Sequence, residues 1–273
     1  MSFAYLLQQS LWFFGLGAVF WMLSLKWGVV RSGPPRNAVP DVIYWFIFPV
    51  LYGAIQGLML TAGFWTMFAG NLHAAEQYFA TGVPALRALP MWAQAILVLL
   101  ITDFYMYWVH RLFHRGRLWR FHAVHHAPTR VDWLTCVRFH PVNVAAYATM
   151  ANVLTIMMGF SPAVLVFLGP FNVIWSGLVH ANLNWDFGPF RYVLASPVFH
   201  RWHHSDVVMD KNFAATFPVL DLLFGTFYMP KGELPLTTGT PHDPVPDTLW
   251  GQLIYPFFPG MFKSPRQELP THG

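Results

Sequence analysis

Histidines are the residues of this sequence with the clearest potential for chemistry. The 273-residue chain has 13 of them, and ten lie between His110 and His204. Eight of these ten form three groups with the spacing i, i+4 or i, i+3, i+4, which places the members of each group on one side of a helix. The groups are His110 and His114, then His122, His125 and His126, and finally His200, His203 and His204.

Imidazole rings this close together need partners for their ring nitrogens. Protonated rings would repel one another, and neutral buried rings must still form hydrogen bonds or bind a ligand. Neutral imidazole is the commonest metal ligand in proteins, and a single zinc site takes only about four ligands. Eight histidines therefore predict two metal ions. The ligand type leaves zinc, copper, iron and nickel open, and without a His-Glu-x-x-His motif a zinc peptidase would lack its base.

The composition of the chain indicates a membrane protein. Hydrophobic residues make up 55% of it, charged residues only 10%, and the mean hydropathy is +0.41. Because soluble domains carry about 25% charged residues, we exclude a soluble enzyme, a disordered chain and a nucleic-acid binder. The single Cys136 excludes a disulfide framework and a metal site built from several cysteines. No Gly-x-Gly-x-x-Gly motif is present, so we expect no flavin or nicotinamide site in this chain, and no haem domain is recognisable.

Long uncharged stretches give the elements that must position the histidines. A bilayer core needs about 20 apolar helical residues, and we expect spans at Met1–Leu25, around Ile43–Trp65 and at Leu89–Val109. Residues 141–185 carry no charge and suffice for two crossings or one re-entrant hairpin, with a break at 159–162. The prediction is an all-α polytopic membrane protein with four to five transmembrane or re-entrant helices and a histidine-rich helical cap on the cytoplasmic side.

The basic residues predict the orientation of these spans. If the loop after the first span is cytoplasmic, 15 of the 16 lysines and arginines are cytoplasmic and only Arg87 lies on the other side, as the positive-inside rule requires. His110 and His180, at the ends of two different spans, then reach the same membrane face. Because arginines outnumber lysines by 12 to 4 in a compact chain, we expect the bacterial inner membrane first and the endoplasmic reticulum second.

The three histidine groups also carry a resemblance to a known family. They read His110-Arg-Leu-Phe-His114, His122-Ala-Val-His125-His126 and His200-Arg-Trp-His203-His204. With the stretches 196–205, 210–213 and 223–226, they resemble the fatty acid hydroxylase / sterol desaturase superfamily of membrane-bound non-haem di-iron enzymes. The resemblance runs from about residue 89 to 230. It implies N-terminal transmembrane helices in 1–88, a hydroxylase-like di-iron domain in 89–230 and a C-terminal cytoplasmic tail in 231–273.

The resemblance further implies an activity with its cofactors and partners. The expected cofactors are two iron ions, with O2 as co-substrate and electrons from a separate donor of the cytochrome b5 or ferredoxin type with its reductase. The expected reaction is oxygen insertion into a C–H bond of a sterol, fatty acyl or related lipid. A desaturase and an ether-lipid (alkylglycerol) monooxygenase are alternatives on the same scaffold. A bis-histidine haem electron-transfer protein, a metal transporter and a structural zinc protein are the alternatives from other classes.

The resemblance adds a ninth ligand, His180, which some family members place between the second and third groups. The expected metal ligands are His110, His114, His122, His125, His126, His180, His200, His203 and His204. Asn184 stands where some members have a tenth histidine, and His140 either joins the site or begins a helix at Pro141. Asp103 either bonds a ligand imidazole or pairs with Tyr107 or an arginine. The residues that we expect beside the ligands are Asp103, His140, Asn184, Asn212 and Asp221.

Overall fold

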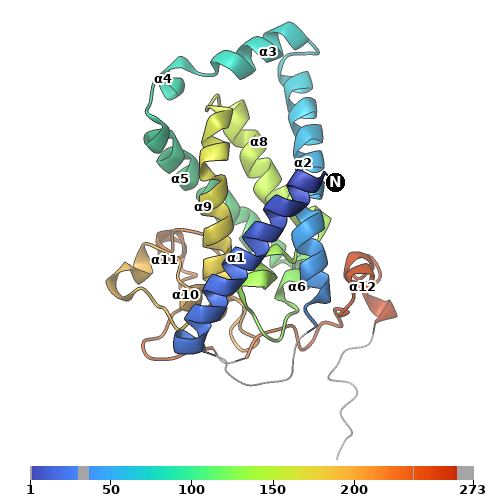
Figure 1. The fold of residues 1–273 in the computed structure, drawn as a ribbon, viewed down its shortest axis with the longest axis vertical. Coiled ribbons are helices and arrows are strands. Elements are labelled where there is room, and N and C mark those ends of the chain that lie inside the picture. Colours follow the sequence, from blue (N-terminus) through green and yellow to red (C-terminus); the bar gives the residue numbers. More distant parts are fainter. Residues whose placement is uncertain (1, 30–36, 236, 263–273) are drawn as a thin grey trace, which may run out of the picture.

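The computed structural model of the chain describes residues 2–29, 37–235 and 237–262, without the side chains of 148–150. The regular structure of these ranges is helical, apart from one isolated bridge between Ser205 and Thr238. Long helices form an upright bundle, and short elements gather at one end of it (Figure 1). The prediction of an all-α fold is therefore confirmed. Arg31 and Arg36 of the predicted basic loop, and the tail from residue 263, lie outside the described residues.

Within the described residues, four helices are long and apolar enough to cross a membrane. They are α1 (Phe3–Trp27), α2 (Val39–Met67), α5 (Met91–Phe113) and α9 (Pro162–His180). Helices α1 and α5 begin two residues after the predicted spans and end a few residues beyond them, and α2 extends its predicted core at both ends. Helix α9 lies in the second half of the uncharged stretch 141–185. Local hydropathy located the first three as spans, because a helix in lipid must be apolar over its whole length. It left α9 open as a crossing or as one leg of a re-entrant hairpin.

The stretch 141–185 breaks where it was expected to break. Its first leg consists of α7 (Pro141–Val144), a π-helical turn η3 (Ala145–Thr149) and α8 (Met150–Met157). This shorter apolar leg, 141–157, is not among the four helices long enough to span. Gly159 follows with a φ of +88°, and a Cβ there would lie 2.7 Å from the Val83 nitrogen, so the turn requires glycine. Ser161 then caps α9 by accepting a bond from the Ala163 amide at 3.3 Å.

The end of the bundle away from the histidines is closed by two short helices, α3 (Leu72–Thr81) and α4 (Pro84–Arg87). Arg87 is the one basic residue that the charge pattern placed on this side. Its guanidinium donates to the Phe79 carbonyl at 2.9 Å and to the Gly159 carbonyl at 3.1 Å. The side chain therefore ties α3 to the turn before α9.

Short helices form the other end, which we call the cap. Its elements are η1 (Gly116–Leu118), α6 (Trp119–His126), η2 (Trp133–Val137), η4 (Gly188–Tyr192), α10 (Pro197–His203), α11 (Val219–Leu223), α12 (Leu249–Ile254) and η5 (Pro259–Met261). Two sequence signals start α10: the Ser196 hydroxyl accepts from the Phe199 amide at 3.1 Å, and Pro197 occupies the first helical position. In Figure 1 the cap lies below the spans, with α11 on one side and α12 on the other.

An aromatic cluster and a buried ion pair join the cap to the first two spans. The rings of Phe13 in α1 and Trp45 in α2 pack edge-on against Trp133 of η2, with centroids 5.6 and 5.5 Å away. A few residues further on, the Arg138 guanidinium donates to the Asp41 carboxylate in the first turn of α2. Both side chains of this ion pair are almost fully buried, so the start of α2 is fixed to the segment that precedes α7.

Candidate metal centre

The nine histidines converge into two adjoining clusters. His110, His114, His122, His126 and His203 form the five-histidine cluster, and His125, His180, His200 and His204 form the four-histidine cluster. Within each cluster the potential ligand nitrogens lie within 4.8 Å of one another, and every ring is buried. The clusters touch, because the rings of His126 and His204 stack with their centroids 4.4 Å apart. The ends of two spans, α5 and α9, thus meet α6 and α10 of the cap at one place.

The two His-His doublets divide between the clusters. His126 and His203 belong to the five-histidine cluster, whereas their neighbours His125 and His204 belong to the other. Consecutive residues of a helix point about 100° apart, so each doublet supplies one ring to each side. The expectation that each group presents all its imidazoles in one direction is therefore wrong in this respect. The doublets instead hold the two clusters next to each other.

Five imidazoles are fixed from behind through their Nδ1 atoms. In each case the partner is a carbonyl or carboxylate oxygen, which can only accept, so Nδ1 carries the proton and Nε2 keeps its lone pair. The contacts are His110 with the Phe213 carbonyl (2.8 Å), His203 with the Lys211 carbonyl (2.7 Å), His125 with the Arg138 carbonyl (3.1 Å), His180 with the Ser176 carbonyl (2.7 Å) and His114 with the Asp210 carboxylate (3.3 Å).

The freed Nε2 atoms face one another. Those of His125 and His180 are 3.2 Å apart although neither has a proton to donate, and those of His114 and His203 are buried without a partner. The other close Nε2 pairs are separated by 2.9 to 3.2 Å. Two nitrogens bound at right angles to one ion at about 2.1 Å lie about 3.0 Å apart. The donors are therefore spaced as ligands around one ion per cluster, and the residues fit two transition-metal ions.

Burial keeps the imidazoles of the cap in the form that binds metal. Loss of water disfavours the charged ring, and this lowers the pKa of His122 and His126 well below the usual value, as does the proximity of other histidines. The same causes lower the pKa of His200, His203 and His204. For His114, burial again lowers the pKa, and the hydrogen bond from its ring to Asp210 opposes that shift.

We expect the metal-free protein to be destabilised by mild acid. Unfolded histidines take up protons below about pH 6.5, whereas the buried rings do not, so stability is complete above that pH and falls as the pH is lowered through it. Each such histidine contributes a loss of about 1.4 kcal/mol per pH unit. Thermal unfolding after chelation should therefore occur at a much lower temperature at about pH 5.5 than at about pH 7.5. An unchanged melting temperature would contradict the neutral, buried state of these rings.

The segment 210–217 supplies the outer partners of the five-histidine cluster, and we call it the carbonyl loop. Its Asp210 carboxylate, Lys211 carbonyl and Phe213 carbonyl bind three of the five rings. Asp210 and Asn212 adopt φ angles of +60° and +59°, which lets successive groups of the loop turn towards the histidines. Residues 210–213 belong to the sequence stretch that resembled the family, although the sequence did not show that backbone oxygens would be the partners.

Two of the residues expected beside the ligands, Asn212 and Asp221, act by holding the carbonyl loop. The Asp221 carboxylate accepts from the Phe213 amide at 2.7 Å and from the Ala214 amide at 2.9 Å. The Asn212 side chain donates to the Phe199 carbonyl at the middle of α10 and exchanges two bonds with the Tyr228 backbone. Both side chains are fully buried. They position the carbonyls and do not themselves contact an imidazole.

Asp103 has different partners from those expected. Its carboxylate accepts from the backbone amides of Ala215, Thr216 and Phe217 at 3.0, 2.9 and 2.7 Å. Neither a ligand imidazole nor Tyr107 nor an arginine takes this place, which corrects both readings made from the sequence. The backbone amides at the far end of the carbonyl loop are not paired within a helix or a sheet. The Asp103 carboxylate, which lies within the span, accepts their hydrogen bonds.

His140 and Asn184 lie outside the two clusters. His140 caps α7, because its Nδ1 accepts from the Val142 amide at 3.2 Å while its Nε2 donates to the Leu253 carbonyl at 3.2 Å. The alternative of a helix start at Pro141 is therefore confirmed, and both ring nitrogens are used. Asn184 is exposed and lines a surface hollow of 190 Å³ beside Arg191 and Glu233. It is not placed to supply a tenth ligand.

Two residues near the clusters were missed from the sequence. The Asn143 amide lies 3.5 Å from the His122 Nδ1, and its Oδ1 is buried without a partner. With the oxygen of this amide directed at Nδ1, His122 has an acceptor like those of its neighbours. Phe139 stacks on the His125 ring with centroids 4.0 Å apart and planes 13° from parallel. Both residues lie within two positions of the His140-Pro141 pair. That pair was the only feature of the sequence that pointed to this segment as part of the site.

The geometry does not match a haem bound between two histidines. Such a haem needs two Nε2 atoms on opposite sides of a flat ring and about 4 Å apart, twice an iron–nitrogen bond. Here each close pair belongs to a cluster of four or five mutually facing nitrogens. These clusters leave no slot for a porphyrin between any two of the rings.

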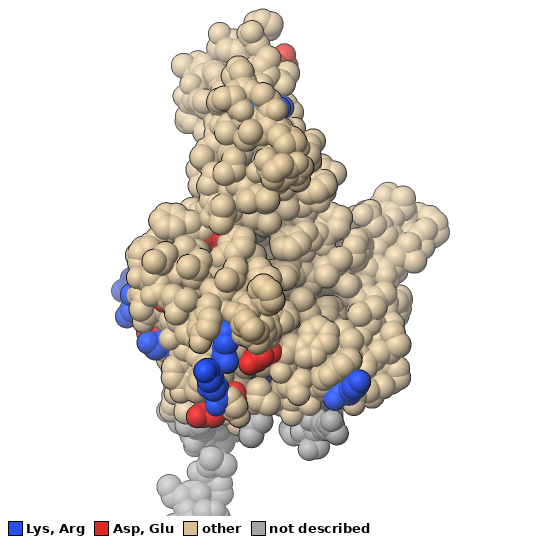
Figure 2. Space-filling model, turned by 90° about the vertical axis from the view of Figure 1, so that its left-hand side faces the viewer, with Lys and Arg blue, Asp and Glu red and all other residues tan. Residues whose placement is uncertain are grey.

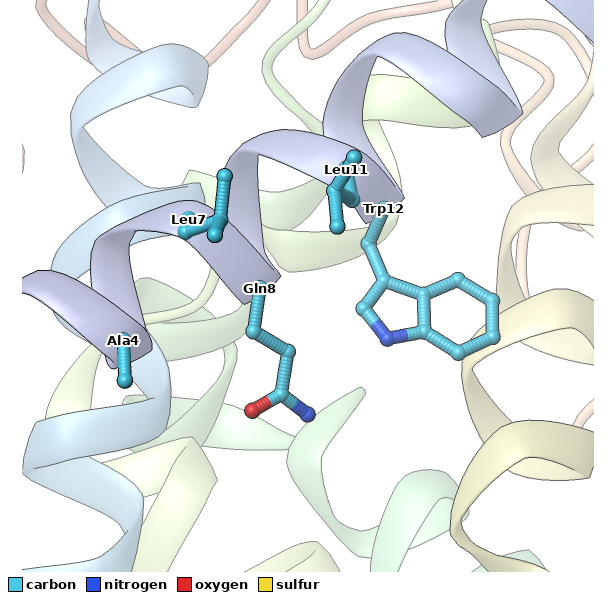
Figure 3. Close-up of a pocket in the computed structure, with 5 residues that line it drawn as sticks. All are labelled: Ala4, Leu7, Gln8, Leu11 and Trp12. Atoms are coloured by element: carbon cyan, nitrogen blue, oxygen red, sulfur yellow. The ribbon is translucent and has the colours of Figure 1, made fainter.

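A hollow of 340 Å³ lies along α1, away from the two clusters, and its lining residues include no metal-binding side chain. It is lined by Ala4, Leu7, Gln8, Leu11 and Trp12. Gln8 and Trp12 extend from the same side of the helix, one turn apart (Figure 3). Its lining is mostly apolar and carries no titratable group, so it is not a second metal site.

Comparisons with known proteins agree with this site. The family model described as fatty acid hydroxylase matches residues 95–226, which contain all nine histidines. An ornithine lipid hydroxylase, OlsE, from Rhizobium tropici is 33% identical over 144 residues, 52% of this chain and 44% of the relative. An alkylglycerol monooxygenase from Xenopus tropicalis is 26% identical over 223 residues, 72% of this chain and 50% of the relative.

A putative methylsterol monooxygenase from Dictyostelium discoideum is 30% identical over 166 residues, 54% of this chain and 57% of the relative. The chain thus spans about half the length of the curated relatives that it matches. No solved structure matches it. Four apolar helices together with this family indicate an integral membrane protein. Residues 95–226 thus match the fatty acid hydroxylase family, and the curated relatives support the wider fatty acid hydroxylase / sterol desaturase superfamily.

Proposed function

We propose that this protein is a membrane-bound di-iron oxygenase that inserts oxygen into a C–H bond of a lipid. The observation that carries the proposal is the convergence of nine buried imidazoles whose Nε2 atoms face two common centres. Such an arrangement is costly unless cations occupy the centres, because lone pairs at about 3 Å repel and buried polar atoms need partners. The relatives named above are hydroxylases and monooxygenases, which favours iron among the metals that imidazole binds.

When bound, two irons would supply the activation of O2. The residues of the chain would hold and orient them. His110, His114, His122, His126 and His203 would bind one ion, and His125, His180, His200 and His204 the other. The backbone carbonyls behind the rings fix their tautomer and direction, which is the usual role of the groups that surround metal ligands.

Exclusion of water is the second contribution of the protein. The ring of Phe213 packs against those of His110, His114 and His203. Tyr107 and Phe199 belong to the same apolar cluster as Phe213, and none of the three has more than 1% of its surface exposed. The Tyr107 hydroxyl is satisfied by Thr226 at 2.8 Å, so Tyr107 has no free polar atom that would bring water in. A dry surrounding protects a reactive centre from side reactions and suits an apolar substrate.

A lipid substrate is supported by the relatives and by the place of the site. The relatives are named for an ornithine lipid, an alkylglycerol and a methylsterol. Ligands come from His110 and His180 at the ends of two candidate spans, where acyl chains can approach. Hydroxylation is the first choice of reaction. Ether-lipid cleavage is the second, because the alkylglycerol monooxygenase match covers 72% of this chain and the reaction is a hydroxylation beside an ether oxygen.

The charge distribution supports an orientation of the protein and a type of electron donor. With the cap in the cytoplasm, as the positive-inside rule favours, the exposed Arg115 and Arg117 beside the five-histidine cluster face the compartment of soluble electron donors. Basic side chains there attract an acidic donor protein and raise its rate of encounter. We place the protein in a bacterial inner membrane with a cytochrome b5- or ferredoxin-type donor.

Lipid profiling tests the proposed function. Cells that express the intact protein should contain a lipid heavier by one oxygen, and cells that express His203→Ala should not. Mass spectrometry of total lipids detects the difference, and metal analysis of the purified protein should find two irons per chain. A lipid lighter by two hydrogens would replace hydroxylation with desaturation. Identical lipids in both strains, with O2 and donor present, would overturn the oxygenase.

A further inference from the structure

The short helix α11 has two chemically opposite faces. On the outer face Val219, Leu222 and Leu223 are 43%, 45% and 71% exposed. On the inner face Asp221 has no exposed surface and binds the amides of the carbonyl loop. An apolar face this exposed on a five-residue helix is unfavourable in water.

The outer face continues the lipid-facing surface of span α5. Phe224, directly after α11, packs its ring against Phe104, Tyr107 and Trp108 of α5, with centroids 6.5, 5.2 and 4.8 Å apart. Phe104 and Trp108 are themselves 49% and 42% exposed on the side of the span. The apolar surface therefore extends without a break from the span onto α11.

The depth of this contact can be estimated along α5. Arg111, whose guanidinium lies 5.7 Å from the Trp108 ring centroid and donates to the Tyr107 hydroxyl, marks the level of the headgroups. Phe104 is seven residues further into the span, about 10 Å along the helix axis. The ring of Phe224 thus reaches a depth at which acyl chains begin.

The charged side chains on the α11 side of the molecule are distributed as expected for a surface that is partly covered by lipid. Figure 2 shows the side on which α11 lies, and the charged side chains gather towards the cap end while the surface above them is uncharged, apart from a small group at the far end. A water-facing surface would carry charges throughout.

We propose that α11 is a membrane-inserted foot whose Val219, Leu222 and Leu223 lie among the acyl chains of the surrounding bilayer. The occupant of the exposed face is lipid, because the face is continuous with a span, rather than a second protein. The foot also links the bilayer to the site: Asp221 on its inner side fixes the Phe213 peptide, and the Phe213 carbonyl holds His110. Insertion of α11 therefore helps to hold the five-histidine cluster in order.

Insertion is tested with a bimane fluorophore on Leu223→Cys, made in the Cys136→Ala background and reconstituted in nanodiscs. Phosphatidylcholine brominated on its acyl chains should quench the fluorophore at least about twofold, and aqueous iodide should have little effect. The control is Glu233→Cys, an exposed position of the cap, which should show the reverse. Strong quenching of Leu223→Cys by iodide, or by neither agent, would overturn the proposal in favour of a water-facing or protein-covered helix.

The link to the site rests on the proposed function and has its own measurement. Leu223→Asp should withdraw α11 from lipid and weaken metal retention in nanodiscs about 10-fold or more, as losing the groups behind a ligand does. Leu234→Asp, at another exposed apolar residue of the cap, should retain metal. If the bimane on Leu223→Cys is quenched by lipid but Leu223→Asp keeps its metal, insertion stands and the link is overturned. The bimane result holds whatever the protein catalyses.

Discussion

A His203→Ala variant should lose the ion of the five-histidine cluster, and a His204→Ala variant the ion of the four-histidine cluster. These neighbouring residues belong to different clusters, so each substitution removes one ligand from one ion only. Metal analysis should find about one iron per chain in each variant instead of two. Lipid oxidation should fall by at least about 100-fold in both, beyond the 10- to 100-fold that follows loss of an outer partner, because neither ion works alone.

Two histidines serve as matched controls for this prediction. His73 is exposed on α3 at the far end of the bundle, and His140 has both ring nitrogens occupied outside the clusters. His73→Ala should keep both ions and full activity. His140→Ala should keep both ions and lose only about 1 kcal/mol of stability with its helix cap. Loss of both ions from His204→Ala together with retention of both by His203→Ala would contradict the division of the doublets.

An Asp41→Asn variant should be destabilised by about 3–5 kcal/mol, because it leaves the charge of Arg138 buried without its counter-charge. Asp41 is fully buried and the Arg138 side chain is 3% exposed. The Arg138 carbonyl holds the His125 ring, so the same variant should also bind the ion of the four-histidine cluster more weakly. Thermal unfolding and metal analysis of the purified protein measure the two effects.

The double variant Asp41→Asn/Arg138→Gln controls for the buried charge. It removes both charges, and a pair replaced together costs less than one partner removed alone, so part of the stability should return. Asp186→Asn removes the charge of a partly exposed ion pair with Arg191, in which the Asp186 side chain is 48% exposed. This variant should change the free energy of unfolding by less than about 1 kcal/mol. Equal melting temperatures for Asp41→Asn and the intact protein would show that the ion pair does not secure this part of the cap.

Much of the fold could be predicted because its determinants are local. The uncharged stretches gave the spans at 3–27, 39–67 and 91–113 to within a few residues, since each residue of a helix in lipid meets the same apolar surroundings. The break before Pro162 followed from glycine, serine and proline in sequence. The outer face of α11 could not be foreseen, because the exposure of Leu222 and Leu223 depends on how α11 and the adjoining Phe224 pack against the rest of the protein.

The candidate site also has parts that could be predicted from the sequence and parts that could not. Histidine spacing identified eight of the nine rings, because a shared ligand is the simplest way to satisfy so many imidazoles, and the family resemblance added His180. Their outer partners were not predictable where they are backbone groups: the carbonyls of Lys211 and Phe213 have no sequence signature. Asp103 was expected near the ligands from its position on α5, yet it binds amides over 100 residues away in the sequence.

The sequence by itself determined the membrane location, the helical class and the histidines that meet, because hydropathy and side-chain chemistry belong to each residue wherever it lies. Only the tertiary structure decided how the nine rings divide into five and four, which nitrogen of each ring faces inward, and which residues hold the carbonyl loop. The physical reason is that a hydrogen bond depends on distances and directions between groups far apart in the chain. Those are fixed only when the cap packs against the ends of the spans.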